Sequence, residues 1–479
     1  MAEVGGIGCG CRGVSGGTFF HPGGFSSQSC FLEQRTRSNR SFFRNVSYVP
    51  SFKRGRLITK RSSVAGNSRI FSMDAREKSR SFVLVSSKHK KVPVYVMMPI
   101  DTFGIDASGC PIIKRLKALT VSLKALKLAG VHGVAVEVWW GIVERFCPLE
   151  FKWSLYEELF RLISEAGLKL HVSLCFHSNM HLFGGKGGIS LPLWIRECYE
   201  DFMLSFSTKF EPYFGNVIEE IGVGLGPSGE LRYPAHPSGD GRWKFPGIGE
   251  FQCHDKYMME DLMAVASQEG KPQWGSRDPP SVGCYNSFPS GVSFFEEGHD
   301  SFLSDYGRFF LEWYSGKLIC HADAILAKAA DVLRRRQEEE KSSVMLVAKL
   351  VGSIGGYYNT ALRDGYDPVA SVLSRHGAAL HIPCLDMADC ETPEKYLCSP
   401  EGLLRQIHDV SKKRTIQVTG RNTSERFDQM GLRQIRENCV QPNGETVRSF
   451  TFFRLNEKIF RVENWNNFVP FIRQMSADM

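Results

Sequence analysis

Residues 134–176 form the stretch VAVEVWWGIVERFCPLEFKWSLYEELFRLISEAGLKLHVSLCF. It begins with a strand-like run, Val134–Trp139, continues through a helical segment, Trp153–Ala166, and ends in a second strand-like run, Leu168–Phe176. Compact apolar runs of this length are typical of buried strands, and parallel strands need a long crossover, usually a helix. The stretch therefore predicts one strand–helix–strand unit of an α/β protein.

The same alternation continues on both sides of this unit. Further strands are predicted at Val92–Met98, Val217–Val223, Val344–Leu350, Leu380–Leu385, Ile416–Thr419 and Phe450–Leu455. Further helices are predicted at Ile112–Leu128, Trp194–Phe210, Phe309–Leu333, Pro368–His376, Glu401–Val410, Arg426–Asn438 and Asn466–Met475. Eight strand–helix units in series predict a (β/α)8 TIM barrel with long loops on its C-terminal face, with a doubly wound sheet as the alternative. The strandless region from Pro234 to Gly298 is predicted to be a functional excursion.

Composition restricts the class of protein. The chain has 479 residues, of which 42% are hydrophobic and 23% charged, so it can build a large core. No apolar run is long enough to span a bilayer, and no membrane partner is expected. The 14 cysteines are scattered without a paired CxxC motif, and no HExxH motif is present. We therefore expect no structural disulfide, no metal site and no cofactor.

Residues 1–80 differ in composition from the remainder. Between Met1 and Met73 the acidic residues are Glu3 and Glu33 alone, whereas arginine and lysine are spread through a segment rich in serine and glycine. Such a composition, without a long apolar core, is typical of an organelle transit peptide. A basic tail that touches nucleic acid is the alternative, and the wide spacing of its charges disfavours it. We expect a disordered leader at 1–80 and one domain at 90–479.

A carboxylate follows the strand predicted at Val217–Val223. Glu230 lies in GLGPSGELRYP, residues 224–234, where glycines let the backbone pass close to a ligand. The active sites of (β/α)8 barrels lie on the loops after the strands, and glycoside hydrolysis usually needs two carboxylates there. Six polar residues fall at or just past predicted strand ends: Glu137, His177, Glu230, Lys349, Asp386 and Arg421. Trp139 and Trp140 could stack on sugar rings or belong to the core.

Several long blocks, from about Val92 to the C-terminus, resemble plant β-amylases. These inverting glycoside hydrolases release β-maltose from the non-reducing ends of α-1,4-glucans. The resemblance is carried by VPVYVMMPID, GVAVEVWWGIVE, WSLYEELFRLISEAGLKL, GLGPSGELRYPAHP, KFPGIGEFQCHDKY, FFLEWYSGKL, GGYYN with RDGYDP, and RHGAALHIPCLDM. It implies a (β/α)8 barrel with a deep pocket. Together with the leader, it implies a protein of starch breakdown in the chloroplast stroma.

The resemblance makes Glu230 the general acid and puts Arg421 where the family has its catalytic base. The block that should contain the second glutamate reads VTGRN, residues 418–422. An inverting enzyme needs a base carboxylate roughly 6.5–9.5 Å from the acid, and a guanidinium cannot accept a proton at neutral pH. A cation near Glu230 also favours the ionised carboxylate, which is the wrong form for an acid. The base position is therefore expected to be non-functional.

The resemblance also implies which residues bind substrate and which are lost. Substrate-binding positions of the family match Glu137, His177, Lys349 and Asn422. Pro383 replaces a sugar-binding threonine, and the Asp-bearing mobile loop expected after His177 has no aspartate. Relative to the family, about forty residues are missing between Glu197 and Cys198 and about fifteen between Gly352 and Gly355.

Three hypotheses follow. The first is a non-catalytic β-amylase-family protein that binds α-glucan or maltose, or regulates starch breakdown, with other starch-degrading proteins as candidate partners. The second is a weak β-amylase in which Asp386 or Glu425 replaces the base. The third, a nucleic-acid-bound regulator, depends on the basic leader alone, and no nucleic-acid partner is expected.

Overall fold

A computed structural model describes most of the chain beyond the leader. The described residues are 91–176, 199–232, 241–244, 247–276, 279, 282–288, 291–296, 298, 301–340, 344–350, 366–391, 399–440 and 445–477. The predicted leader, His177 and both places where segments are absent lie outside these residues.

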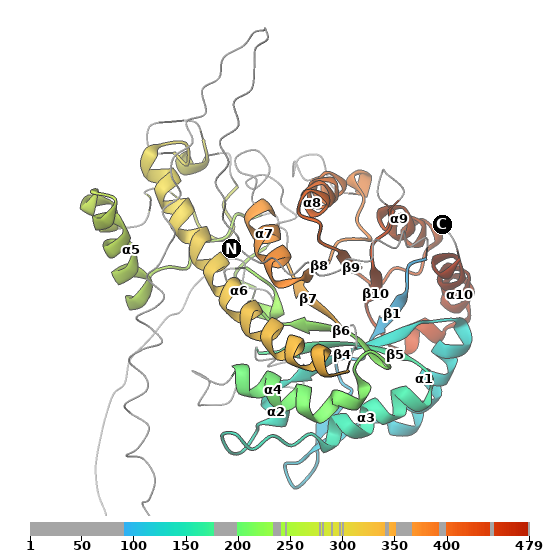
Figure 1. Ribbon diagram of the computed structural model, residues 1–479. Helices are drawn as coiled ribbons and strands as arrows, with labels where there is room; N and C mark the ends of the chain where they lie inside the picture. Colours follow the sequence, from blue (N-terminus) through green and yellow to red (C-terminus); the bar gives the residue numbers. More distant parts are fainter. Residues whose placement is uncertain are drawn as a thin grey trace, which may run out of the picture. The chain divides into compact units, whose positions relative to one another are not determined.

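Eight parallel strands close into a barrel (Figure 1), in the order β1-β10-β9-β8-β7-β6-β5-β4. The strands are β1 (Val94–Met97), β4 (Gly133–Trp139), β5 (Lys169–Cys175), β6 (Ile218–Val223), β7 (Met345–Lys349), β8 (Ala378–Ile382), β9 (Val418–Arg421) and β10 (Ser449–Phe452). Because β1 pairs with both β4 and β10, the sheet has no edge. The predicted TIM barrel is confirmed, and the doubly wound alternative is wrong.

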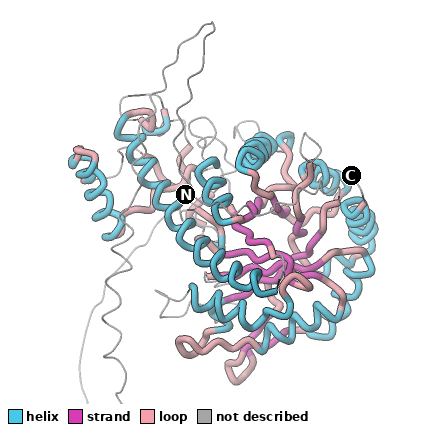
Figure 2. Tube along the Cα trace, in the orientation of Figure 1, coloured by secondary structure: helices cyan, strands magenta, loops and turns pink. Residues whose placement is uncertain are grey.

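Helices other than α5 surround the strands (Figure 2). The helices of the chain are α1 (Leu116–Ala129), α2 (Trp140–Val143), α3 (Ser154–Glu165), α4 (Tyr199–Phe210), α5 (Lys256–Gln268), α6 (Asp305–Glu340), α7 (Tyr366–His376), α8 (Pro400–Arg414), α9 (Gln429–Asn438) and α10 (Val462–Ser476). Helices around the barrel pack against each other, as α6 does on α4 and α7. In the part of the chain that is described, no helix is both long and apolar enough to cross a membrane.

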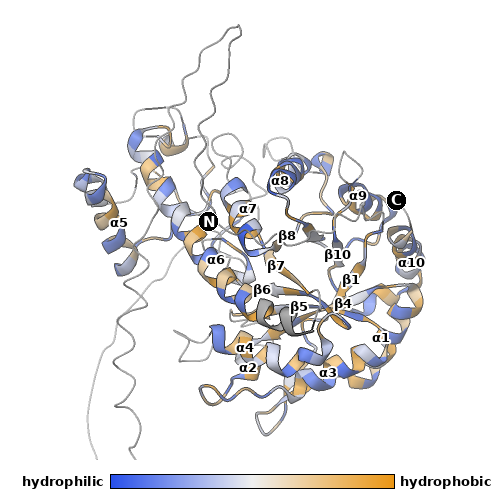
Figure 3. Cartoon of the chain, in the orientation of Figure 1, coloured by the Kyte–Doolittle hydropathy of each residue, from blue (hydrophilic) through white to orange (hydrophobic). Residues whose placement is uncertain are grey.

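Amphipathic helices bury one face against the barrel. In α3, Tyr156, Leu159, Phe160 and Ile163 recur at helical spacing and are fully buried, while Arg161 pairs with Glu165 in solvent. Figure 3 shows the resulting hydrophobic and hydrophilic faces along the helices.

The two neighbouring tryptophans belong to this core. The side chains of Trp139 and Trp140 are 3% and 0% exposed. The ring of Trp140 contacts those of Phe176, Tyr199 and Phe202. The core interpretation of these tryptophans is therefore correct, and sugar stacking on them is excluded in this arrangement.

Several element boundaries differ from prediction, and two of them show the physical reason. Pro111–Ile113 forms strand β3, paired with β2 (Phe103–Ile105), so the helix expected from Ile112 begins only at Leu116. The strand expected at Leu380–Leu385 ends at Ile382, because buried Leu385 lies in the following loop against Gly420. In both cases apolar residues continue outside the element that the pattern indicated.

The excursion between Pro234 and Gly298 has structure of its own. Its described residues contain no strand but include α5, whose first turn is capped by the Asp255 carboxylate. Two apolar clusters join the excursion to the start of α6 and the residues before it: Cys253, Leu262, Phe310, Trp313 and Tyr314, and Ile248, Val292, Phe294 and Phe302. Much of the described excursion is therefore a packed layer with its own small core.

Candidate active site

The loop after β6 places Glu230 at the mouth of the barrel. A Cβ atom on Gly226 would lie 2.5 Å from the carbonyl oxygen of Glu230, so the tight turn requires glycine there. The N–H of Leu231 donates to the carbonyl of Lys349 over 2.8 Å, which ties this loop to the end of β7. The tight turn and this hydrogen bond together place Glu230 beside Lys349.

Glu230 is 7% exposed and surrounded by cations. Its Oε1 lies 2.8 Å from Nζ of Lys349 and 3.8 Å from Nη2 of Arg421, and its Oε2 lies 3.2 Å from Nε of Arg232. Both carboxylate oxygens therefore have cationic partners. A general acid instead needs one protonated oxygen directed at the leaving group.

Arg421, the last residue of β9, occupies the base position that the sequence indicated. Its side chain is 15% exposed, and its guanidinium carbon lies 4.7 Å from the centre of the Phe453 ring. Burial lowers the pKa of Arg421 below its usual value, but a guanidinium keeps its proton at neutral pH. Arg421 therefore supplies a fixed positive charge where water would have to be deprotonated.

Lys349 joins the same charged group from the end of β7. Burial, and then the nearby charge of Arg421, lower the pKa of this lysine. The structure thus brings together Glu230, Arg421 and Lys349, as the predicted barrel required.

Glu137 lies near the end of β4 and faces a residue that sequence analysis missed. Its Oε2 is 3.8 Å from Nη2 of Arg454, whose guanidinium carbon is 4.6 Å from the Phe453 ring centre. The predicted strand Phe450–Leu455 placed Arg454 inside the sheet, but β10 ends at Phe452. A basic residue just after the last strand was the signal that could have identified this rim residue.

Asn422, which the resemblance implied to bind substrate, has its side chain hydrogen-bonded to backbone groups. It is fully buried, and its amide nitrogen donates to the carbonyls of Ser424 and Phe453 over 2.6 and 3.1 Å. Its amide oxygen accepts from the N–H of Phe453 over 2.7 Å. Both amide hydrogens are used on backbone, so Asn422 shapes the loops that carry Arg421 and Phe453, and it has no donor left for a sugar.

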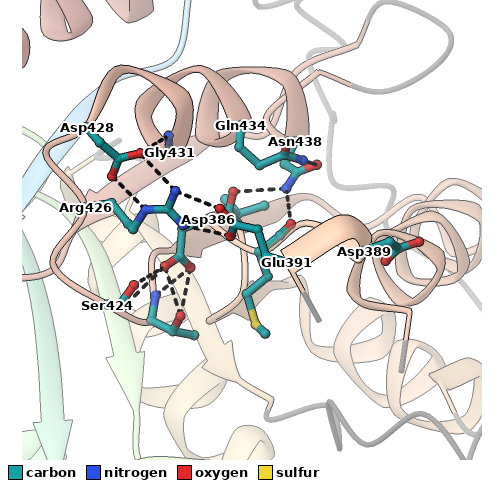
Figure 4. Close-up of polar contacts among 12 residues, drawn as sticks. Asp386, Asp389, Glu391, Ser424, Arg426, Asp428, Gly431, Gln434 and Asn438 are labelled. Atoms are coloured by element: carbon teal, nitrogen blue, oxygen red, sulfur yellow. Dashed lines mark hydrogen bonds and ion pairs between the residues drawn. The ribbon is translucent and has the colours of Figure 1, made fainter. Parts of the chain in front are cut away.

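The carboxylate of Asp386, one candidate replacement for the base, accepts hydrogen bonds from the loop after β9 (Figure 4). Its Oδ1 accepts from the N–H and hydroxyl of Thr423 over 2.7 and 3.0 Å. Its Oδ2 accepts from the N–H and hydroxyl of Ser424 over 3.1 and 2.9 Å. Since the residue is also 2% exposed, its carboxylate orders backbone and is not placed to activate water.

Glu425, the other candidate base, has both of its carboxylate oxygens bound by other side chains. Its Oε2 lies 2.6 Å from Nζ of Lys458, and its Oε1 accepts from the amide of Asn456. Neither replacement proposed from the sequence is therefore positioned as a base.

A second ionic group fixes the loop that leads from β9 into α9 (Figure 4). Arg426 donates to both oxygens of Glu391, over 2.8 and 2.9 Å, and to Asp428. These contacts hold the pKa of Asp428 down at about 2, first through the hydrogen bond from Arg426. Asp428 in turn caps α9 at Gly431, so the rim behind Asp386 is well anchored.

In the described ranges, no group of three or more His, Cys, Asp or Glu side chains could hold a metal ion. The ion pairs that the described residues form at the barrel mouth involve two carboxylates, one lysine and three arginines.

A (β/α)8 barrel with a glutamate on its C-terminal rim is an architecture that glycoside hydrolases use. The model of glycosyl hydrolase family 14 matches residues 95–198 and 196–479, and the chain belongs to this family. It is 81% identical over 534 residues to inactive beta-amylase 4, chloroplastic, of Arabidopsis thaliana, with all of both chains covered. It is 36% identical to beta-amylase 1, chloroplastic, of the same plant, over 80% of this chain and 75% of the relative.

The fold also agrees with a solved structure. The catalytic domain of the beta-amylase from Paenibacillus polymyxa superposes with a TM-score of 0.66 at 22% identity, covering 81% of this chain and 99% of that domain. The chain is thus a non-catalytic β-amylase-family protein, and the chloroplast location predicted from the leader is confirmed by these relatives.

The alignments also bear on the missing segments. The match to the 81% identical relative runs over 534 positions against 479 residues here, a difference of 55. The family match is broken at residues 196–198, where the larger segment is absent. Both observations agree with the two absences expected from the sequence.

Proposed function

We propose that this protein binds α-glucan or maltose at its barrel mouth without cleaving it, and so regulates starch catabolism in the chloroplast stroma. The observation that carries the proposal is the ion pair between Arg421 and Glu230, which puts a cation where inverting hydrolysis needs a base. Other starch-degrading proteins are the candidate partners through which binding would act. Residues 1–80 would then direct import, and residues 90–479 would form the binding domain.

The residues left at the mouth support binding better than catalysis. Glu137 and Lys349 are side chains with hydrogen-bonding groups at strand ends, in positions that match sugar contacts of the family. Such contacts contribute to ground-state affinity whether or not the chemical step is possible. His177, the third such position, remains part of the proposal.

Equilibrium binding to the full chain tests this proposal. We expect maltose and soluble starch to bind, to be recovered uncleaved, and to bind at least about tenfold more weakly to Lys349→Gln. Lys412→Gln is the matched control, because Lys412 is an exposed lysine on α8. If neither ligand binds, or if both variants bind as the unmodified chain does, the proposed site is wrong.

A further inference from the structure

Two arginines at the barrel mouth leave their hydrogen-bond donors unused. Among the described residues, neither Arg421 nor Arg454 has a hydrogen-bond acceptor, although each guanidinium carries five N–H groups. Nε of Arg421, and Nε and Nη1 of Arg454, are buried without a partner. Buried donors without acceptors are rare in folded proteins and indicate that a partner is missing.

The ionic contacts at the mouth are also unbalanced. Among the described residues, three cations at the mouth, Lys349, Arg421 and Arg454, have only the two carboxylates Glu137 and Glu230 as ion-pair partners. The nearby carboxylate of Asp386 is already bonded to Thr423 and Ser424. A buried positive excess of this kind is unfavourable until an anion compensates it.

One aromatic ring contacts both arginines, and, in addition to burial, the charge of Arg454 contributes to lowering the pKa of Arg421. Their guanidinium carbons lie 4.7 and 4.6 Å from the centre of the Phe453 ring, and neither has an ion pair shorter than 3.8 Å in the described residues. The ring attracts both cations but cannot accept their in-plane N–H groups. A pair of planar N–H forks is a geometry that suits a multidentate oxyanion.

We infer that the barrel mouth binds a phosphate monoester carried on a glucose unit, with Arg421 and Arg454 as its phosphate ligands. The sugar half of this inference rests on the proposed function; the phosphate half is independent of it. Phosphate suits two arginine forks because it carries several terminal oxygens and up to two negative charges. Replacing the base by arginine would thus have changed the preference of the pocket from a neutral to an anionic sugar.

Titration calorimetry on the full chain, at constant ionic strength set with chloride, tests the inference. The probes are inorganic phosphate, maltose and glucose 6-phosphate. We expect saturable binding of phosphate, and binding of glucose 6-phosphate at least tenfold tighter than that of either phosphate or maltose. Arg421→Gln and Arg454→Gln should each weaken glucose 6-phosphate at least tenfold and maltose less than threefold.

Arg433→Gln is the matched control, because Arg433 is 77% exposed on α9 and pairs only with Glu437 in the described residues. If the control weakens phosphate as much as Arg421→Gln does, the anion binds elsewhere on the surface and the inference is overturned. If maltose binds and neither phosphate nor glucose 6-phosphate binds more tightly than maltose does, the inference is overturned and the proposed function stands.

A third result would support the phosphate site and contradict the proposed sugar binding. If phosphate binds through both arginines while maltose does not bind and the sugar adds nothing, the glucose half and the proposed function are both wrong. If Arg421→Gln fails to fold, two measurements replace the binding test on that variant. One is the same titration on Arg421→Lys, and the other is competition between sulfate and glucose 6-phosphate on the unmodified chain. The absence of such competition also overturns the inference.

Discussion

Nη2 of Arg421 lies 3.8 Å from Oε1 of Glu230, so a cation and the acid-type glutamate of the family share one corner of the barrel mouth. The first ends β9, and the second is held to β7 by the tight turn at Gly226 and the bond from Leu231 to Lys349. The pairing is a consequence of the barrel's geometry, which gathers residues distant in sequence onto one rim. Arginine at this position removes the catalytic base, and its ion pair engages the carboxylate of Glu230, the acid of the family.

Restoring the family residue should not restore activity. Arg421→Glu replaces a cation by a carboxylate, but Glu230 keeps Lys349 and Arg232 as partners, and Pro383 still lacks the hydroxyl of the family. We expect maltose release from starch to stay below about 1% of that of an active relative, a deficit of roughly 2.7 kcal/mol in the barrier. Release approaching that of the relative would mean that Arg421 alone caused the loss.

The two partners of the ion pair should differ in their effect on stability. Removing Arg421 leaves Glu230 with two cations, so Arg421→Met should be neutral or stabilise the fold by about 1 kcal/mol. Removing the charge of Glu230 takes the paired carboxylate away from Lys349 and Arg421, so Glu230→Gln should cost about 3 kcal/mol.

Urea unfolding with a common slope measures both changes. Equal losses for Arg421→Met and Glu230→Gln would contradict the idea that the mouth has excess positive charge.

Asp386 should prove structural. Asp386→Asn turns an acceptor of two N–H groups and two hydroxyls into a side chain whose NH2 faces donors. We expect a loss of about 2–3 kcal/mol in the free energy of unfolding. Asp409→Asn, at an exposed position of α8, is the control and should change stability by less than about 0.5 kcal/mol. A stable Asp386→Asn protein would show that these bonds do not order the rim.

An acid-sensitive contact lies between α7 and α8. The hydrogen bond from Arg414, and then that from Lys413, lower the pKa of Asp367 to about 2 in the folded protein. Because the folded pKa is below the unfolded value of about 3.9, the stabilisation is full above pH 4 and is lost as the pH falls toward 2.

Solvent screening reduces the contribution of this contact to about 1 kcal/mol. The difference in unfolding free energy between the unmodified chain and Asp367→Asn should therefore be constant from pH 5 to 7 and vanish below pH 2. A difference that grows on acidification would contradict this assignment.

The strands and the loops differ in how well the sequence predicts them. Buried parallel strands give compact apolar runs, so β4, β5 and β7 were each predicted to within one residue or so at either end. The end of β8 was misplaced because Leu385 is as buried in its loop as it would be in a strand. An apolar pattern reports burial and cannot by itself report where hydrogen bonding between strands stops.

The site was predictable where a motif carried it. Glu230 and Arg421 stand in recognisable blocks, and the barrel brings them together. The commitment of Asp386 and Asn422 to backbone groups, and the approach of Arg454 to Phe453, depend on loop conformations after β9 and β10. Side-chain partners across such loops are set by three-dimensional packing, which local sequence does not contain.

Maltose release from soluble starch by the full chain, measured beside an active relative and the Glu230→Gln variant, shows whether the barrel mouth retains catalysis. We predict no release above that of the variant, because Arg421 cannot accept a proton and Glu230 is already paired. Clear release that is lost in Glu230→Gln would contradict the account, since a base other than Arg421 would then have to act at this mouth.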